Sequence, residues 1–198
     1  LRPPVDAERL GWLPLLGGLA VTDALRRVAG LDARLKWPND VLVPHGAADG
    51  EPLKVCGVLA EAVPVSRTAP AVVLGIGLNV SQAEAELPVP TATSLLLAGA
   101  ATTDRDTVLR AVLRALAVRY RAFVDADGDP RASGVGAAYR EACSTLGRQV
   151  AVQLPGDRTA RGPAQEVDDL GRLVVLVDGV PRPFAAGDVV HLRPGEEP

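Results

Sequence analysis

The chain has 198 residues, of which 47% are apolar, so it can bury a core and is not an intrinsically disordered segment. Its formal net charge is −3 without a long run of one sign, which argues against a nucleic-acid or membrane surface. No apolar run reaches the roughly 18 residues of a membrane-spanning helix, and no signal peptide is recognisable, so we expect a cytoplasmic protein.

Three residue types are scarce or absent. Methionine is absent and residue 1 is leucine, so we expect the chain to lack its natural start. Lysine occurs only at Lys36 and Lys54, and asparagine only at Asn39 and Asn79. A genome that favours arginine and alanine codons explains the scarcity, but not the positions at which these residues remain. A planar guanidinium cannot replace a compact ammonium in a tight site, which makes the two lysines candidates for function.

The first predicted elements are a helix and two short strands. A helix is predicted over residues 14–29, because proline is tolerated in a first turn and Gly30 follows the last apolar position. Residues 33–37 and 41–43 are predicted strands, separated by a turn at Pro38. The turn interrupts apolar sequence with the polar group KWPND, which needs an explanation.

Two apolar strands follow, over residues 54–63 and 71–80, with a hairpin connection at 64–70. Strict alternation places Lys54 and Gly57 on opposite faces of the first strand.

In the second of these strands, alternation places Gly75, Gly77 and Asn79 on one face. Glycine weakens a strand and often marks the close approach of a ligand or of another backbone. We therefore expect a flat strip without side chains that ends in an amide.

The remaining sequence predicts helices over residues 106–126 and 130–142. After these helices the helical pattern ends. Short strands separated by Gly, Pro and Asp turns predict a small barrel of about five strands. We therefore expect an α+β fold with a mixed or antiparallel sheet, in two domains over residues 1–146 and 147–198. Cys56 fits no metal-ligand spacing with the second cysteine, so both are expected to be buried free thiols.

The polar residues in these segments can form one pocket with several donors, one carboxylate and little side-chain bulk. Such a pocket suits a phosphate group with its divalent ion. Serine hydrolase, P-loop and dinucleotide-binding motifs are absent. Taken singly, Asn39-Asp40 is also explained as a tight turn and Lys54 as a strand-edge lysine. The candidate residues are Lys36, Asn39, Asp40, Lys54, Gly75, Gly77 and Asn79.

The ordered set KWPND, KVCGVLAEA, VVLGIGLNV, ATSL and VVHLR resembles biotin protein ligases over nearly the whole chain. The resemblance implies a biotin/lipoate ligase-like catalytic domain followed by an SH3-like β-barrel. It also implies a cytoplasmic, ATP-dependent enzyme that uses biotin and Mg²⁺. The biotin carboxylate attacks the α-phosphate of ATP, and the biotinyl group of biotinyl-5'-AMP then passes to a lysine of a biotin carboxyl carrier protein, of the acetyl-CoA carboxylase type.

The resemblance also implies site residues. Lys54 is the expected catalytic residue, and Asp40 the expected Mg²⁺ ligand. The expected biotin and adenylate site consists of Lys54, Gly57, Gly75 and Gly77. The expected ATP site consists of Lys36, Trp37, Asn39, Asp40, Asn79, Thr93 and Arg193.

The chain departs from the family pattern at its N-terminal side, where the Ser-Thr-Asn segment and the arginine-rich loop over biotin are not found. We therefore expect an N-terminally incomplete catalytic domain that is inactive in isolation. Three alternatives stay open: a non-catalytic fragment that binds nucleotide or carrier protein, a bifunctional ligase-repressor with a DNA-binding domain upstream, and a lipoate ligase. No membrane or nucleic-acid partner is expected for this chain, and its oligomeric state is not predicted.

Overall fold

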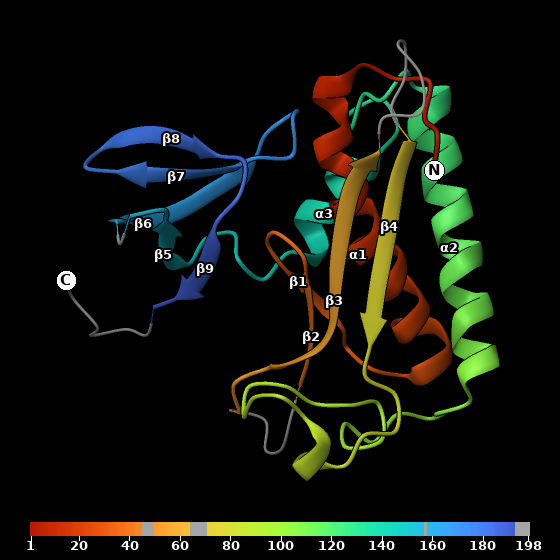
Figure 1. Cartoon of the computed structure of the whole chain (residues 1–198). Helices are drawn as coiled ribbons and strands as arrows, with labels where there is room; N and C mark the ends of the chain where they lie inside the picture. Colours follow the sequence, from red (N-terminus) through yellow and green to blue (C-terminus); the bar gives the residue numbers. More distant parts are fainter. Residues whose placement is uncertain (45–49, 64–70, 157, 193–198) are drawn as a thin grey trace.

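The computed structural model describes residues 1–44, 50–63, 71–156 and 158–192, which form two separate antiparallel sheets (Figure 1). The first sheet has four strands in the order β1-β2-β3-β4, and the second has five in the order β8-β7-β6-β5-β9. Helices cover one side of the first sheet, and the second sheet lies beside it (Figure 1). The predicted α+β class and the run of five short C-terminal strands are confirmed.

The strands of the first sheet are β1 (Arg34–Lys36), β2 (Asp40–Val43), β3 (Leu53–Val63) and β4 (Ala71–Leu78). The predicted strands at 33–37, 41–43, 54–63 and 71–80 are confirmed, with ends that shift by no more than two residues. The connection predicted at 64–70 lies outside the described residues. The sheet therefore consists of a short hairpin, β1-β2, joined to a long ribbon, β3-β4.

Helix α1 (Trp12–Ala24) is buried on nearly every side, because it lies between the first sheet and α2. Such a helix is expected to be apolar all round, as this one is. A Cβ at Gly17 would lie 3.0 Å from a methyl carbon of Leu74, so the glycine allows close packing of the helix on β4. The helix continues through a π turn (Leu25–Ala29) and ends at Gly30, whose φ is 66°. The predicted helix end at this glycine is confirmed.

Helix α2 (Arg105–Asp125) is also confirmed, within one residue at each end of the prediction. The Asp104 carboxylate accepts a hydrogen bond from the Thr107 N–H at 2.9 Å, which caps its first turn. Across the described ranges of the chain, no helix is both long and apolar enough to cross a membrane.

The second predicted helix is shorter than expected, because α3 (Val135–Ala142) begins only after Gly134. The Asp129 carboxylate accepts hydrogen bonds from the N–H groups of Arg131, at 2.7 Å, and Ala132, at 3.2 Å, and holds this segment in a turn. Gly134 then adopts a φ of 72°. The prediction of a helix from residue 130 was wrong because side-chain hydrogen bonds and a left-handed glycine replace its first turn.

The strands of the second sheet are β5 (Gln149–Leu154), β6 (Arg158–Val167), β7 (Leu173–Val177), β8 (Val180–Phe184) and β9 (Asp188–His191). The long strand β6 pairs with β5 in its first half and with β7 in its second half. An irregularity between Ala164 and Glu166 marks the shift, and such bulges bend a strand. One strand thereby takes part in both halves of this small curved sheet.

Two buried tryptophans join the two sheets. The indole N–H of Trp12 donates to the Asp169 carbonyl at 2.9 Å, and that of Trp37 donates to the Gly171 carbonyl at 3.1 Å. Both acceptors belong to the turn between β6 and β7, and both tryptophans are only 1% exposed. The turn is therefore fixed by two hydrogen bonds from which water is largely excluded, so the relative position of the sheets is well defined.

Trp37→Phe is expected to lower the free energy of unfolding by about 1–3 kcal/mol, because the Gly171 carbonyl loses its indole donor in a buried position. Denaturant unfolding followed by circular dichroism measures the change. Leu113→Ala, at a 53% exposed position on α2, is the control and is expected to change stability by no more than about 0.5 kcal/mol. Equal stability of Trp37→Phe and the control would contradict the anchoring role of the indole.

Candidate active site

The KWPND segment forms the β1-β2 hairpin. Lys36 pairs with Asp40 across the hairpin, so their side chains lie on the same face of the sheet. The Asn39 carbonyl accepts a hydrogen bond from the Val58 N–H at 2.8 Å, and the Trp37 N–H donates to the Thr145 hydroxyl at 3.0 Å. The turn is thus fastened to β3 on one side and to the segment before β5 on the other. The polar side chains of Lys36 and Asp40 are then directed into a pocket, which accounts for the interruption of the apolar sequence at this place.

A β-bulge at Val55 decides where Lys54 points. Val41 pairs with Cys56 while Leu42 pairs with Lys54, so Val55 is an extra residue in β3. An extra residue reverses the alternation of side chains. A Cβ at Gly57 would lie 3.3 Å from both Cε and Nζ of Lys54, so the lysine stretches across this glycine. The prediction of opposite faces was wrong because it assumed an uninterrupted strand.

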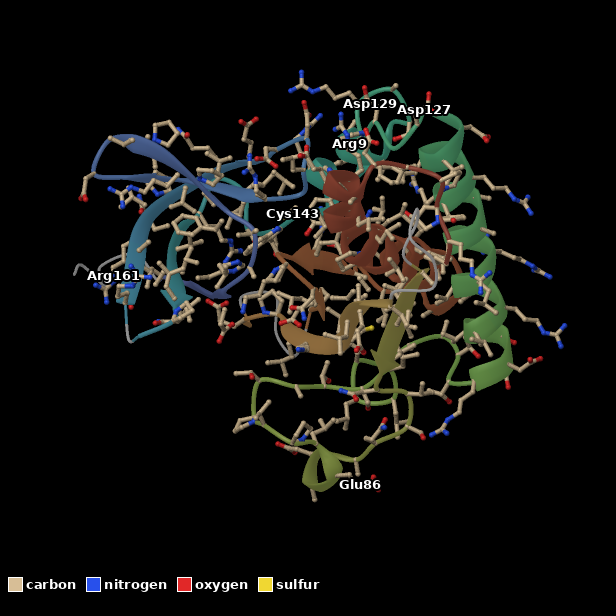
Figure 2. All side chains as sticks on the ribbon, turned by 45° about the horizontal axis from the view of Figure 1, so that its top comes forward. Arg9, Glu86, Asp127, Asp129, Cys143 and Arg161 are labelled. Atoms are coloured by element: carbon tan, nitrogen blue, oxygen red, sulfur yellow. The ribbon has the colours of Figure 1, made fainter. Side chains whose placement is uncertain are left out.

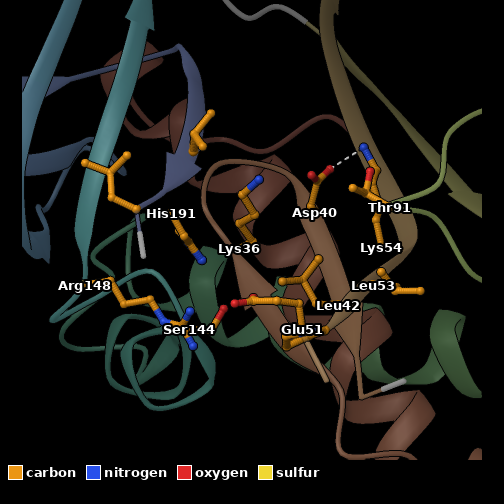
Figure 3. Close-up of a pocket in the computed structure, with 13 residues that line it drawn as sticks. Lys36, Asp40, Leu42, Glu51, Leu53, Lys54, Thr91, Ser144, Arg148 and His191 are labelled. Carbon is orange, nitrogen blue, oxygen red and sulfur yellow. Dashed lines mark ion pairs between the residues drawn. The ribbon is translucent and has the colours of Figure 1, made fainter. Parts of the chain in front are cut away.

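Lys54 forms an ion pair with Asp40, with 2.5 Å between Nζ and Oδ1 (Figure 3). The Lys54 side chain is 42% exposed and that of Asp40 is 17% exposed, so the ammonium stays accessible from the pocket. The lysine backbone is also held on both sides: its N–H donates to the Thr91 carbonyl at 2.9 Å, and its carbonyl accepts from the Thr93 N–H at 2.8 Å. The ammonium is therefore positioned before any ligand arrives.

Cys56 adds no reactive thiolate to this region. Burial raises the pKa of its thiol to about 12, which outweighs the opposite effect of the neighbouring Lys54 ammonium. A neutral thiol is a weak nucleophile. The expectation that Cys56 and Cys143 are buried free thiols is confirmed.

A pocket of about 690 Å³ lies between the first sheet and the second (Figure 3). Three cationic side chains, two carboxylates and one imidazole face it. Its lining consists of Lys36, Asp40, Leu42, Glu51, Pro52, Leu53, Lys54, Thr91, Ser144, Arg148, Val190, His191 and Leu192. The structure thus brings together the predicted residues Lys36, Asp40 and Lys54, and adds a second wall that sequence reasoning missed.

The second wall carries Arg148 and His191. His191 Nε2 lies 3.1 Å from the hydroxyl oxygen of Thr145, the same buried hydroxyl that accepts the Trp37 N–H. Burial, followed by the positive charges of Lys36 and Arg148, lowers the pKa of His191 to about 4. His191 is therefore neutral at pH 7. The motif VVHLR pointed to this strand, but it could not show that the histidine faces the hairpin lysine.

The predicted glycine strip lies on the outer face of β3 and β4. Gly57 pairs with Gly77, and Leu59 with Gly75. These residues and Asn39 line a shallow, open depression of about 500 Å³. Leu59 is 70% exposed, so this face is uncovered in the described part of the chain. The flat strip is present, and Lys54 lies at its border with the main pocket.

Asn79 and Thr93 lie away from the main pocket. The Asn79 side-chain amide donates to the Thr93 carbonyl at 2.9 Å, which holds the segment around residue 93 beside β4. Thr93, Leu53 and Leu97 contribute to a further pocket of about 550 Å³. The Thr93 hydroxyl is buried and has no hydrogen-bond partner among the described residues. A buried hydroxyl without a partner is uncommon in folded proteins.

Two further predicted site residues need a separate account. The Trp37 side chain is buried and directed to Gly171, so it packs between the sheets and does not line the main pocket. Arg193 lies outside the described residues. A contact of either residue with a nucleotide stays a prediction.

Two family models match the sequence. Residues 2–79 match the "Biotin/lipoate A/B protein ligase family", and residues 145–192 match the "Biotin protein ligase C terminal domain". The first match spans the first sheet and the second match spans the small one, so both parts of the fold resemble ligases of the biotin/lipoate class.

Individual relatives are more specific than the family models. The chain is 42% identical over 192 residues to a biotin–[acetyl-CoA-carboxylase] ligase of Mycobacterium tuberculosis, covering 96% of this chain and 65% of the relative. It is 25% identical to the bifunctional ligase/repressor BirA of Escherichia coli, covering 93% of this chain and 54% of the relative. Together with the two family models, these relatives make the chain similar to biotin protein ligases over nearly its whole length. It spans less than two thirds of the length of these relatives.

Solved structures agree with this assignment. A biotin protein ligase from Aquifex aeolicus superimposes with a TM-score of 0.73 at 27% identity, covering 94% of this chain and 77% of that chain. The same enzyme in complex with biotin and ATP superimposes with a TM-score of 0.69, covering 93% of this chain and 72% of that chain.

The free energy of unfolding is expected to fall as the pH decreases from 6.5 to about 4. His191 titrates near pH 4 in the folded chain and near its ordinary value of 6.5 when unfolded, so the unfolded state binds more protons in this window. His191→Gln cannot take up this proton and should show a shallower pH dependence. Denaturant unfolding at half-unit pH steps measures both slopes, and equal slopes would contradict the burial of a neutral imidazole.

Proposed function

We propose that this chain carries the adenylate-forming site of an ATP-dependent biotin–protein ligase. The observation that carries the proposal is the position of Lys54. Its ammonium is held by Asp40 at 2.5 Å, crosses Gly57, and borders both the glycine strip and the main pocket. A cation at such a border suits a reaction that brings two anions together.

In the proposed first step, a carboxylate oxygen of biotin attacks the α-phosphorus of ATP. The new bond joins carboxyl oxygen and phosphorus, the bond to the β-phosphate bridging oxygen breaks, and pyrophosphate leaves with the electron pair. Lys54 stabilises the negative charge that develops on the α-phosphate oxygens. In the second step, a neutral lysine amine of the carrier protein attacks the acyl carbon of biotinyl-5'-AMP. The bond between the acyl carbon and the phosphate oxygen breaks, AMP leaves with the electron pair, and the new amide nitrogen releases a proton to water.

The binding roles follow the three surfaces of the site. Gly57, Gly75 and Gly77 offer a flat backbone on which the biotin rings can lie beside Lys54. Lys36 and Asp40 supply charges for the triphosphate in the main pocket. Asn39 lies at the outer strip. The proposed nucleotide-binding set is completed by Asn79, Thr93, Trp37 and Arg193.

Asp40 is the proposed Mg²⁺ ligand. The described residues contain no group of three His, Cys, Asp or Glu side chains that could enclose a metal ion. Mg²⁺ usually keeps several waters and binds one or two carboxylates together with substrate phosphates, so one carboxylate beside a phosphate site fits it. When bound, the ion would neutralise phosphate charge. Asp40 would then orient both the ion and Lys54.

The proposed partner is the biotin carboxyl carrier protein of a carboxylase of the acetyl-CoA carboxylase type, and the proposed compartment is the cytoplasm. A second candidate function is binding of nucleotide or carrier protein without catalysis. The 70% exposure of Leu59 beside the glycine strip favours it, because a biotin bound there would be open to water on one side.

Formation of biotinyl-5'-AMP separates the two candidates. The assay uses biotin, α-labelled ATP and magnesium, with this chain alone and with a chimera that carries, ahead of Leu1, the corresponding N-terminal segment of the Mycobacterium tuberculosis relative. We expect the chimera to form the adenylate and the chain alone to form little. Absence of product from a folded chimera that binds ATP would favour binding without catalysis.

Lys54→Arg in this chimera is expected to reduce the rate of adenylate formation about 10²–10³-fold, because a guanidinium cannot occupy the place of the ammonium across Gly57. Arg34→Lys, an exposed position on β1, is the matched control and should keep the rate. Thermal unfolding of both variants checks that the fold is retained. A Lys54→Arg rate within about threefold of the control would remove Lys54 from the catalytic step.

A further inference from the structure

The wall of the main pocket that faces Lys54 has no role in the proposed function. It consists of Ser144 and Arg148, which precede β5, and of His191 at the end of β9. Figure 3 shows Lys36 between this wall and the Lys54–Asp40 pair. The pocket therefore has a cation at each end, Lys54 at one and Arg148 at the other, and the neutral His191 lies beside Arg148.

Within the described ranges, the positive charges near the second end have no ion-pair partner. Among the described residues, neither Lys36 nor Arg148 forms an ion pair. Of the two carboxylates that line the pocket, Asp40 is engaged with Lys54, and Glu51 is exposed to solvent. Two cations that face one pocket without a buried counter-charge form a ready site for an anion.

His191 lies between these cations. Its Nε2 is occupied by the Thr145 hydroxyl at 3.1 Å, which leaves Nδ1 for a ligand. Its burial and the charges of Lys36 and Arg148 keep the imidazole neutral, as its lowered pKa shows. A multivalent anion in the pocket would reverse the sign of the local potential and favour the imidazolium ion.

We propose that Arg148 and His191, together with Lys36, form a subsite for the two phosphates that leave as pyrophosphate, and that His191 gains a proton when this anion binds. The subsite rests on the proposed function, because it assumes that the α-phosphate is held at Lys54. The leaving group then departs toward the opposite end of the same pocket. Arg148 contributes a bidentate donor and His191 a charge-assisted one.

The charges of the groups that face His191 support this assignment. Lys36 and Arg148 repel its proton, and the neutral Thr145 hydroxyl and Ser144 do not titrate near pH 7. The carboxylates of Asp40 and Glu51 would favour the proton, but they do not outweigh burial and the two cations. No further carboxylate lines the pocket in the described part of the chain, so an added anion would change this balance.

Binding of sodium pyrophosphate to this chain tests the subsite without any catalytic step. Calorimetry at pH 6 and pH 8 gives the dissociation constants. Arg148→Gln is expected to weaken binding about tenfold at both pH values, because one charged donor is lost. Arg148 is exposed, so its replacement leaves the core intact. Arg161→Gln, an exposed arginine on the same small sheet (Figure 2), is the matched control and should bind as the unaltered chain does.

His191→Gln is expected to weaken binding more at pH 6 than at pH 8. The titration of pyrophosphate itself is the same for both proteins, so the ratio of the two dissociation constants isolates the proton on His191. The chain has only 2 histidines, so this variant also assigns the imidazole signals in nuclear magnetic resonance spectra. The pKa of His191, about 4 without the anion, should rise by about two units or more with saturating pyrophosphate, because only then is the imidazole protonated at pH 6.

The outcomes separate this proposal from the proposed function. Equal binding by Arg148→Gln, His191→Gln and Arg161→Gln, or no binding at all, overturns the subsite and leaves the adenylate assay to stand on its own. If pyrophosphate binding depends on Arg148 and His191 but the chimera forms no adenylate, the subsite is supported. The proposed ligase reaction is then contradicted. A larger effect of Arg148→Gln on ATP than on AMP would show that the β- and γ-phosphates are the groups bound.

Discussion

The site depends on one extra residue in β3. Without the bulge at Val55, Lys54 would lie on the helix-covered face, among apolar side chains that cannot accommodate a charge. With the bulge, the Lys54 side chain extends across Gly57 and reaches Asp40. The consecutive residues Val55 and Cys56 are then both buried. The backbone register, rather than the choice of side chain alone, therefore creates a charge at the border of a flat surface and a pocket.

A second constraint is the attachment of the small sheet to the large one. The indoles of Trp12 and Trp37 bind the β6-β7 turn, and Thr145 connects the KWPND hairpin with His191. The two hydrogen bonds donated by Trp37, to Gly171 and to Thr145, are fully buried, so they are made where water does not compete. The cationic pocket exists only because residues from both sheets meet across it.

Sequence reasoning found what depends on local pattern. Apolar periodicity and Gly30 marked the first helix, and the spacing of turn residues marked the five short strands. It also selected Lys36 and Lys54 as the rare lysines, and Asp40 as the carboxylate of the same motif set. Each of these inferences needs only residues that are close in sequence.

What sequence reasoning missed depends on contacts distant in sequence. The bulge at Val55 has no signature in the strand itself, since Val, Cys and Gly are compatible with either register. The turn before α3 is selected by Asp129 hydrogen bonds that compete with the first helical turn. The burial of Trp37 and the approach of His191 to Lys36 require the placement of a sheet more than a hundred residues further along the chain.

The shared Thr145 hydroxyl has a consequence for heat sensitivity. It hydrogen-bonds both the Trp37 N–H of the hairpin and His191 of β9. Loosening of the small sheet would therefore move His191 and Arg148 away from Lys36 while both sheets are still folded. The pocket would then lose its capacity for multivalent anions before the chain loses its secondary structure. Anion affinity would therefore report whether the two sheets are still attached to each other.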